Sequence, residues 1–283
     1  MRGVVIIYKR DREDAARLAT ELKKWLQAKG ISVQSQQNPT EVPTESPPPL
    51  LTLPDNTDLI VVLGGDGTFL SVARTLENRM IPVIGVNLGG FGFLTEINRE
   101  SCFQELEQIF QGHYEIEKRM RLQVNIYRQD RIIFQQSVLN DVVINKGTLA
   151  RIINLKTSID SCYLTHYRAD GLIIATPTGS TAYNLSAGGP IVYPTADVII
   201  LTPICPFTLS NRPLILPSSA VIRIELEGRS QDIVVTCDGQ IGCQLHPHDQ
   251  IVIRAAKQPL QLVRSPSTNY FEILRAKLKW GQY

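Results

Sequence analysis

The 283-residue sequence lacks several features that would define its class at once. Its five cysteines are an odd number with no C-x-x-C pair, which argues against a metal or disulfide framework and favours reduced thiols inside the cell. The first apolar run, at residues 3–7, is too short for a signal peptide or a membrane span. We therefore expect a cytoplasmic protein that binds no membrane.

Excess charge and spaced histidines are also missing. The formal net charge is +2, which gives no general attraction to nucleic acid, although a locally basic pocket for phosphate stays open. The four histidines show ligand spacing only at His246 and His248, and one H-x-H pair is a weak metal signal. We expect no nucleic-acid partner and no metal site built from the protein's own side chains.

The sequence does contain enough apolar residues to form a large core. Hydrophobic residues make up 43% of the chain, and its length suits one large domain or two ordinary ones. Residues 3–8 form a continuous apolar run, typical of a strand buried on both faces. Apolar residues at helical spacing follow, at Ala15, Leu18, Leu22, Trp25 and Leu26, and then a strand candidate at 31–36. This strand–helix–strand pattern predicts a parallel α/β layer.

The α/β layer continues beyond a proline-rich stretch. Residues 39–57 are predicted to form a mobile loop, to which we assign no role. Strands are predicted at 58–63 and 81–87, each followed by a glycine-rich turn, at 64–67 and 89–92. Because ligands bind outside the carboxyl ends of strands in open parallel sheets, we expect the two turns to face one crevice.

The character of the sequence changes after two further helices. These helices are predicted at 68–80 and near 99–111. Residues 122–144 and 220–240 then alternate apolar and polar side chains around polar turns, which predicts antiparallel hairpins. Many short strands of this kind favour a second domain with a β-sandwich-like fold.

The end of the chain is predicted to be helical. Phe271, Leu274 and Leu278 lie on one face of this helix, which we expect to pack back on the first domain. We place an α/β domain at 1–98, joined by 264–283, and a β-rich domain at 99–263.

The most informative turn is formed by Gly64, Gly65, Asp66, Gly67 and Thr68. A strand that feeds a glycine turn into a helix N-terminus presents backbone N–H groups to a phosphate. The turn is no Walker A loop, because no Gly-Lys pair follows, and no dinucleotide fingerprint, because Leu70 replaces the third glycine. Its aspartate could accept a proton from an attacking hydroxyl or help to hold Mg²⁺; the alternative is a simple Asx-type turn.

A second break, rich in glycine and hydroxyl groups, follows a strand at 172–176. It is no hydrolase nucleophile elbow, because Asn184 stands where G-x-S-x-G needs a glycine before Ser186. A helix beginning near Thr181 could instead place Tyr183 against a flat base. A helix cap followed by core residues explains the same pattern.

Two more turns in the β-rich half contain acids. Asn140 and Asp141 could bond an adenine edge or a ribose, but an ordinary polar turn fits equally well. Asp238 and Gly239 form an Asp-Gly pair, which is common in hairpin turns.

The order and spacing of these motifs resemble those of the NAD kinase family. The matching segments are GGDGTFL, GVNLGGFGFL, LNDVVI, DGLIIATPTGSTAYNLSAGGP and CDGQ, between about residues 58 and 240. The GGDG turn alone is shared with lipid kinases and phosphofructokinases, whereas the Thr-Gly-Ser-Thr-Ala-Tyr stretch is much more specific. The resemblance implies an α/β domain, a β-sandwich-like domain, and transfer of a γ-phosphoryl group to the 2′-hydroxyl of the adenosine ribose of NAD.

The resemblance also implies roles for individual residues. Asp66 matches the catalytic aspartate near the 2′-hydroxyl, and Asp238 an acid that shares the base or metal role. The phosphate-binding turn comprises Gly64, Gly65, Gly67 and Thr68. The NAD-binding residues are Gly67, Phe93, Asn140, Asp141, Asp170, Thr181, Ala182, Tyr183 and Ser186. Among these, Asn140 and Asp141 hold the adenosine part, and Asp170 faces the nicotinamide end.

The implied ligands are NAD and a phosphoryl donor, ATP or polyphosphate, with Mg²⁺ or another divalent cation bound mainly through the donor's phosphates. A homodimer or homotetramer is implied, in which a neighbouring chain completes the NAD site. Two alternatives remain. A lipid or sugar kinase of the same superfamily explains the GGDG turn but not residues 181–183. A non-catalytic NAD(P)-binding sensor is disfavoured by the joint presence of Asp66, Asn140, Asp170 and Asp238.

Overall fold

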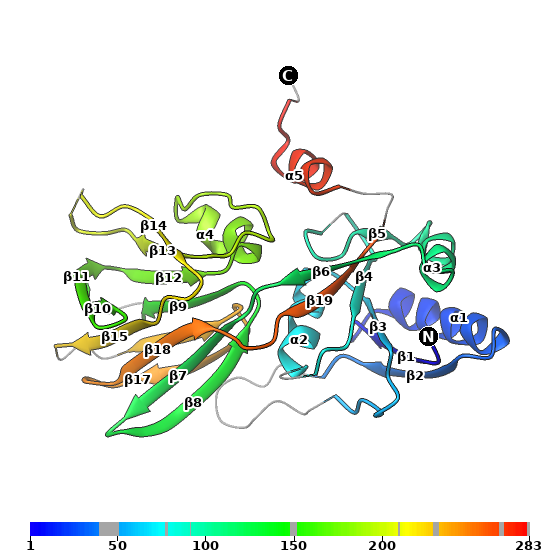
Figure 1. Ribbon diagram of the computed structural model, residues 1–283, viewed down its shortest axis with the longest axis horizontal. Coiled ribbons are helices and arrows are strands. Elements are labelled where there is room, and N and C mark those ends of the chain that lie inside the picture. The colour runs from blue at the N-terminus through cyan, green and yellow to red at the C-terminus, as the bar shows by residue number, and fades with distance from the viewer. Residues whose placement is uncertain are drawn as a thin grey trace. The chain divides into compact units, whose positions relative to one another are not determined.

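The computed structural model describes residues 1–39, 51–76, 79–90, 92–147, 152–208, 210–228, 232–265 and 269–281. The chain forms two compact units (Figure 1). Of the described residues, unit 1 comprises those within 1–39, 51–118 and 260–281, and unit 2 comprises those within 119–259. Unit 1 thus runs about twenty residues past the boundary expected at 98. Much of the proline-rich stretch at 39–57 lies outside the described residues.

Unit 1 is built on a seven-stranded sheet with the order β2-β1-β3-β4-β19-β6, in which β5 also pairs with β4. Its strands are β1 (Gly3–Tyr8), β2 (Ser32–Gln37), β3 (Leu59–Leu63), β4 (Val83–Asn87), β5 (Ile97–Asn98), β6 (Glu115–Arg119) and β19 (Leu260–Arg264). The pairs from β2 through β4 to β5 and β19 are parallel, which confirms the predicted α/β layer.

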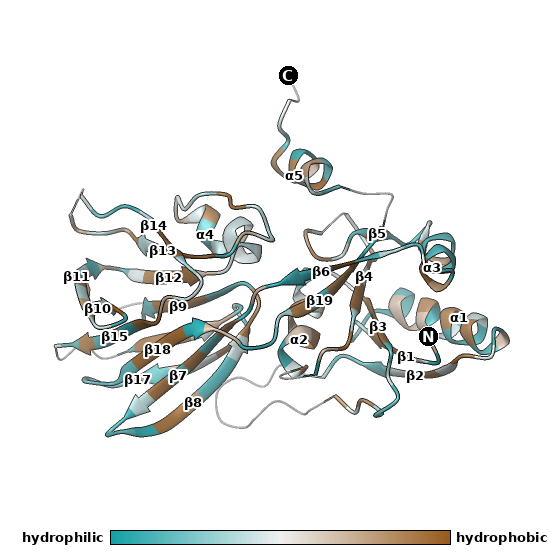
Figure 2. Cartoon of the chain, viewed as in Figure 1, coloured by the Kyte–Doolittle hydropathy of each residue, from teal (hydrophilic) through white to brown (hydrophobic). Residues whose placement is uncertain are grey.

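The core of unit 1 explains why these segments form strands and helices. Strands β3 and β4 are buried along their whole length, and Figure 2 shows them as apolar bands. Helix α1 (Glu13–Ala28) buries a stripe that includes Leu18, Leu22 and Leu26, as its spacing predicted. Helices α2 (Asp66–Thr75) and α3 (Cys102–Phe110) complete the unit's first part.

Unit 2 contains two antiparallel six-stranded sheets. One has the order β11-β10-β15-β18-β7-β8 and the other β14-β13-β12-β9-β16-β17. The first comprises β7 (Leu122–Arg128), β8 (Arg131–Val138), β10 (Ile153–Ile159), β11 (Cys162–Ala169), β15 (Ile222–Glu227) and β18 (Gln250–Ala255). The second comprises β9 (Asp141–Lys146), β12 (Gly171–Ala175), β13 (Val198–Ile204), β14 (Leu214–Pro217), β16 (Ile233–Cys237) and β17 (Ile241–Leu245). One buried cluster takes side chains from both sheets, which confirms a β-sandwich.

Three predicted details were wrong. Residues 220–240 do not form one hairpin, because β15 pairs with β10 and β18 while β16 pairs with β9 and β17 in the other sheet. Helix α2 begins at Asp66 rather than at residue 68, since Gly65 is extended and caps the helix. In the C-terminal helix α5 (Tyr270–Leu278), Phe271 is 55% exposed, and the buried side chains are Tyr270, Ile273 and Leu274.

The C-terminal helix belongs to unit 1, as expected. It begins with a side-chain cap, in which Asn269 Oδ1 accepts a hydrogen bond from the N–H of Glu272 at 3.0 Å. None of the helices in the described part of the chain is long and apolar enough to cross a membrane.

Candidate functional site

The GGDG turn lies at the carboxyl end of β3 and leads directly into α2. Asp66 is the first residue of this helix, so its carboxylate lies near the N-terminal end of the helix dipole. Asp66 is half-buried, Gly67 is exposed and Thr68 is buried. The strand end is anchored to its neighbour, because the N–H of Gly64 donates to the carbonyl of Val86 in β4 at 3.0 Å.

The Asp66 carboxylate ties the GGDG turn to the second glycine-rich turn. Its Oδ2 accepts the N–H of Phe93 at 2.9 Å, and its Oδ1 accepts the N–H groups of Leu94 at 3.1 Å and Thr95 at 3.2 Å. The Thr95 hydroxyl also donates to Oδ1 at 3.1 Å. The two turns therefore meet within unit 1, which confirms that they face one place at the edge of the sheet.

Thr95 and Asn87 support this carboxylate and were not identified from the sequence. Asn87 Nδ2 donates to the Thr95 hydroxyl at 2.9 Å, and Asn87 Oδ1 accepts the N–H of Gly89 at 2.7 Å. Thr95 is fully buried. The signal that could have found it is a polar residue inside the apolar run GFLTEI. Asp66 is thus held by a buried chain of hydrogen bonds, which fixes its orientation.

Packing requires glycine at two positions of these turns but not at a third. A Cβ on Gly64 would come within 2.6 Å of Thr68 Oγ1, and a Cβ on Gly92 would collide with the Asp66 carboxylate and the Thr95 hydroxyl. A Cβ on Gly65 would meet no described atom within 4 Å, and the extended backbone of Gly65 accepts any residue. Neither packing nor conformation requires glycine there, so the space beside Gly65 is open to a ligand.

A second acid cluster lies in unit 2, where β8 passes into β9. Asp238 sits in the turn between β16 and β17 with φ 51°, followed by Gly239 with φ 66°, which is the left-handed pair of a hairpin turn. Its carboxylate accepts the N–H groups of Leu139 at 3.0 Å, Asn140 at 2.7 Å and Asp141 at 3.2 Å. Asp238 therefore joins this hairpin turn to the Asn140–Asp141 turn.

Asp141 is a buried acid beside another acid. Burial and, to a lesser extent, the nearby Asp238 carboxylate together raise the pKa of its carboxyl to about 7, against a lowering effect of the N–H of Tyr183. Asp141 is 4% exposed. Its bond to Tyr183 brings the start of α4 (Tyr183–Ser186) to the acid pair. Proton binding at Asp141 is therefore poised near neutral pH.

We expect the stability of the chain to fall as the pH rises through the range set by Asp141. Between about pH 4 and 7 the folded chain holds a proton that the unfolded chain has lost, so this contribution is complete below about pH 4 and lost by about pH 7. Asp141→Asn, which stays neutral, should be more stable than the original chain by on the order of 2–4 kcal/mol at pH 8 and by much less at pH 4. Urea denaturation at both pH values measures this.

The control for this experiment is Asp160→Asn, which changes an exposed aspartate of the same unit. It should shift the free energy of unfolding equally at both pH values. An Asp141→Asn variant with the same shift at pH 4 and pH 8 would contradict the proposed titration.

The hydroxyl-rich break forms a short 3₁₀ turn (Thr178–Thr181) and then α4. Buried Thr176, also unforeseen, donates to the carbonyl of Leu139 at 2.6 Å and accepts the N–H of Gly179 at 3.0 Å. This links the break to the Asn140–Asp141 turn. The candidate residues at the break remain accessible: Tyr183 and Ser186 are exposed, and Thr181 and Ala182 are half-buried.

Asp170 does not join this cluster. The register pairs Ala175 with Asp141 at one end of β12 and Gly171 with Asn145 at the other, and Asp170 precedes Gly171. It forms an ion pair with Lys146 Nζ at 2.6 Å. At about 3.3 Å per residue, Asp170 lies roughly 15–20 Å along the strand from the acid pair. Within one chain, the candidate set of unit 2 is therefore split between two ends of a sheet.

The other reactive side chains add no further centre. All five cysteines lie outside any disulfide, and Cys102 and Cys237 are buried. Burial raises the pKa of Cys102 to about 12, so this thiol stays protonated at neutral pH. Among the described residues there is no group of three or more His, Cys, Asp or Glu side chains arranged to hold a metal.

Comparison with known proteins shows which family the chain belongs to. Residues 50–114 match the ATP-NAD kinase N-terminal domain, and residues 139–265 match the ATP-NAD kinase C-terminal domain. The chain is 59% identical to the NAD kinase of Syntrophobacter fumaroxidans over 282 residues, with all of both chains covered. The chain belongs to the NAD kinase family. The NAD kinase of Syntrophotalea carbinolica is 47% identical, again with all of both chains covered.

Solved structures of the NAD kinase family share the fold. Yeast NADH kinase, complexed with NADH, has a TM-score of 0.87 and 29% identity, covering 100% of this chain and 89% of its own. An NAD kinase from Archaeoglobus fulgidus, in complex with ATP, has a TM-score of 0.76 and 26% identity, covering 98% of both chains. The two-domain architecture expected from the resemblance is thus the architecture of NAD kinases.

Proposed function

We propose that this chain transfers the terminal phosphoryl group of a donor to the 2′-hydroxyl of the adenosine ribose of NAD, with Asp66 beside the reacting hydroxyl. Membership of the NAD kinase family supports the reaction class. The observation that carries the role of Asp66 is its carboxylate, fixed by three backbone N–H groups next to an open glycine.

Asp66 has the geometry of an orienting group and proton acceptor. Of its two oxygens, Oδ1 accepts three of the four bonds from described residues and Oδ2 accepts one. Oδ2 therefore keeps a lone pair for the acceptor hydroxyl. In the transfer, the bond from the terminal phosphorus to its bridging oxygen breaks and a bond to the 2′ oxygen forms. The hydroxyl proton passes to Asp66 and then to water, so NAD and ATP give NADP, ADP and a proton.

The glycine turn suits the phosphate that is being transferred. Phosphoryl transfer passes through a loose transition state, so positioning and charge neutralisation account for most of the catalysis. Gly64, Gly65, Gly67 and Thr68 form the turn that leads into α2, with open space beside Gly65, and the helix dipole at this N-terminus favours an anion. Mg²⁺ enters as part of the donor substrate, because it is usually held by phosphates plus one or two carboxylates.

The residues proposed to bind NAD are Gly67, Phe93, Asn140, Asp141, Thr181, Ala182, Tyr183 and Ser186. Exposed Tyr183 offers an aromatic face to the adenine ring, and its N–H is bonded to Asp141. Asp238, the second proposed catalytic acid, positions the Asn140–Asp141 turn through its accepted N–H bonds. This cluster presents amide and carboxylate groups suited to the hydroxyls of a ribose.

A second copy of the chain is proposed to complete the NAD site. Asp170 lies at the opposite end of β12 from Asp141, so one chain does not bring both to the same ligand end. In a symmetric dimer or tetramer, the Asp170 of a neighbouring chain can supply the missing contact. We propose this homo-oligomer as the active form.

Mixing two inactive variants tests the shared site. Asp66→Asn and Asp170→Ala should each be nearly inactive alone, and a refolded equal mixture should recover about a quarter of the original activity, since random pairing leaves that fraction of sites intact. NADP formation is measured on the unfractionated refolded mixture, because selecting mixed dimers would raise the expected recovery to about half. A mixture no more active than its components would show that Asp66 and Asp170 act within one chain or that Asp170 has no role.

The proposed function is tested by an acceptor and donor panel. Purified protein with Mg²⁺ and either ATP or polyphosphate would be given NAD, NADH, a diacylglycerol or fructose 6-phosphate. We expect NAD or NADH to be the only acceptor phosphorylated, giving NADP or NADPH together with ADP or a shortened polyphosphate. Phosphorylation of the lipid or sugar instead would favour the wider GGDG superfamily, and tight NAD binding without turnover would favour a sensor.

A further inference from the structure

A group of cations lies at the same edge of the unit 1 sheet as Asp66. The N–H of Lys9 donates to the carbonyl of Leu63 at 2.9 Å, so the end of β1 lies beside the residue that precedes the GGDG turn. On the other side, Asn87 of β4 pairs with Asn98 of β5, and Arg99 follows. Adjacent strands are about 4.8 Å apart, so these strand ends form a row roughly 15 Å long.

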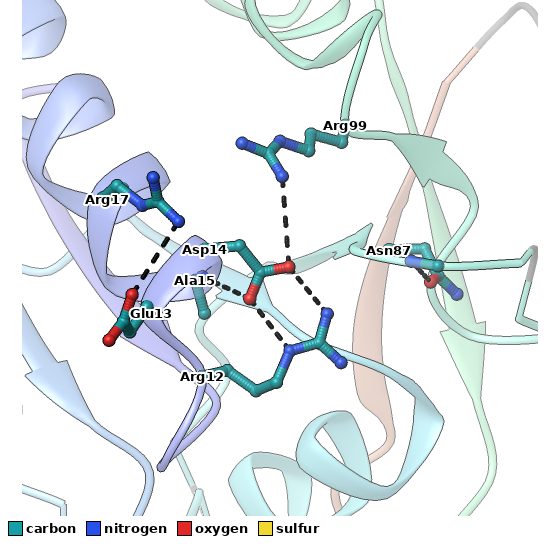
Figure 3. A network of polar contacts seen from close by, with 8 residues as sticks. Arg12, Glu13, Asp14, Ala15, Arg17, Asn87 and Arg99 are labelled. Carbon is teal, nitrogen blue, oxygen red and sulfur yellow. Dashed lines mark hydrogen bonds and ion pairs between the residues drawn. The ribbon is translucent and has the colours of Figure 1, made fainter.

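Two of these cationic side chains form ion pairs with Asp14. Arg12 forms a bidentate pair with its carboxylate, with Nε to Oδ1 at 2.8 Å and Nη2 to Oδ2 at 2.6 Å. Arg99 Nη1 approaches the same Oδ2 at 3.9 Å. Figure 3 shows the two guanidinium groups reaching Asp14 from different sides, while Arg17 turns toward Glu13. The cluster of Arg12, Asp14 and Arg99 carries a net charge of +1.

Both arginines keep donors for a ligand. Arg12 and Arg99 have side chains that are 44% and 45% exposed, whereas Asp14 is 22% exposed. Among the described residues, no other acceptor engages Nη1 of Arg12 or Nε and Nη2 of Arg99. Each guanidinium group therefore keeps N–H groups beyond those that contact Asp14, and these suit the oxygens of a phosphate.

Stability alone is a poor explanation for this arrangement. Ion pairs exposed to this degree contribute about 0–1 kcal/mol to the stability of the fold. The pair between Arg12 and Asp14 alone would be enough to attach α1 to the loop before it. The second arginine, Arg99, comes from a distant part of the chain, directly after strand β5. Exposed Lys9 and Arg10 add positive charge to the same loop, offset in part by Asp11. Together, Lys9, Arg10, Arg12 and Arg99 form a cationic rim at the edge of the sheet where α2 begins. The N-terminus of α2 is the helix end that favours an anion.

We propose that Arg12 and Arg99, held by Asp14, bind the phosphate chain of the phosphoryl donor. This inference rests on the proposed function, in which the terminal phosphate lies at the GGDG turn. A chain that ends there can continue along the edge of the same sheet to the rim, and a phosphate chain is common to ATP and inorganic polyphosphate. Arg12 and Arg99 are then donor-binding residues, distinct from the acids that bind NAD.

Removing either guanidinium group should weaken binding of the phosphoryl donor and leave binding of NAD unchanged. We expect Arg12→Gln and Arg99→Gln each to raise the KM for ATP about tenfold, and the double variant more, with the KM for NAD changed less than twofold. Arg17→Gln is the matched control, since it removes a cation from the same helix that does not contact Asp14. It should leave both KM values within twofold.

Direct binding separates this inference from the proposed function. Isothermal titration of ATP and of tripolyphosphate, each with Mg²⁺, should show weaker binding in both glutamine variants, whether or not NADP forms. If the variants bind ATP more weakly but bind tripolyphosphate as well as the original chain does, the site does not recognise the phosphate chain and the proposal is overturned. A raised KM for NAD, or no change in either substrate, would overturn the donor assignment. If a glutamine variant fails to fold, Arg12→Lys and Arg99→Lys keep the charge, lose the planar fork and should show a smaller rise.

Discussion

Asp66→Asn should greatly slow NADP formation while the protein stays folded and still binds NAD. The variant keeps the size of the side chain but loses the charge and the basic oxygen, so kcat should fall by about 10²–10⁴-fold. The KM for NAD should change little, because the acids of unit 2 are the residues proposed to bind it. Steady-state NADP formation, with NAD binding measured by titration, separates the two quantities.

Two controls separate chemistry from positioning in this experiment. Asp55→Asn removes an exposed aspartate of the same unit that pairs with Arg79 at 3.6 Å, and it should have no effect. Thr95→Val removes one bond to Asp66 Oδ1 but keeps the carboxylate, so kcat should fall about tenfold at most. A fully active Asp66→Asn variant would remove Asp66 from the mechanism and leave it a turn residue.

Gly92→Ala should strongly reduce the activity of the enzyme although it replaces no proposed catalytic group. The new methyl would collide with the Asp66 carboxylate and the Thr95 hydroxyl, so the carboxylate must move. Displacement of a positioned group by about 1 Å can cost about 10²-fold in rate, and we expect a loss of this size in kcat. NADP formation normalised to folded protein measures the effect.

Gly90→Ala is the comparison, because it lies in the same turn but its methyl would meet no described atom within 4 Å. It leaves the bonds of Asp66 intact, and we expect it to lose at least tenfold less activity than Gly92→Ala. Equal losses in the two variants would show that the turn itself contacts the ligand and that the position of Asp66 is not what limits the rate.

The sequence predicted unit 1 well because its signals are local. Continuous apolar runs identified β1, β3 and β4, and helical spacing identified α1. Glycine-rich turns at the ends of two neighbouring parallel strands meet because of the sheet, so their shared edge was predictable as well. The start of α2 was not, since extended Gly65 caps the helix without a side-chain acceptor and leaves no polar cap to read.

The partners of each acid could not be predicted, because they come from distant segments. Asp66 is held by N–H groups 27 to 29 residues away, and Asp238 by N–H groups 97 to 99 residues away. Backbone donors carry no sequence signature. Asp170 was grouped with the other NAD-binding residues by resemblance alone, and only the register of β12 and β9 showed that it lies at the far end.

The alternation of β15 predicted its burial correctly but not its partner. Ile222, Ile224 and Leu226 are buried, as the pattern required. The same alternation fits either sheet of a sandwich, however, so the sequence did not show that β15 and β16 separate. Pairing in a two-sheet core depends on contacts across the whole unit, which a short pattern does not record.

The product of the reaction with NAD tests the central claim most directly. Purified protein would be incubated with NAD, Mg²⁺ and ATP, and the product followed by phosphorus NMR beside an Asp66→Asn sample. We predict one new phosphomonoester on the 2′ oxygen of the adenosine ribose, equal in amount to the ADP released, and none in the variant. A phosphate at another position, or ADP release without a phosphorylated dinucleotide, would contradict the account.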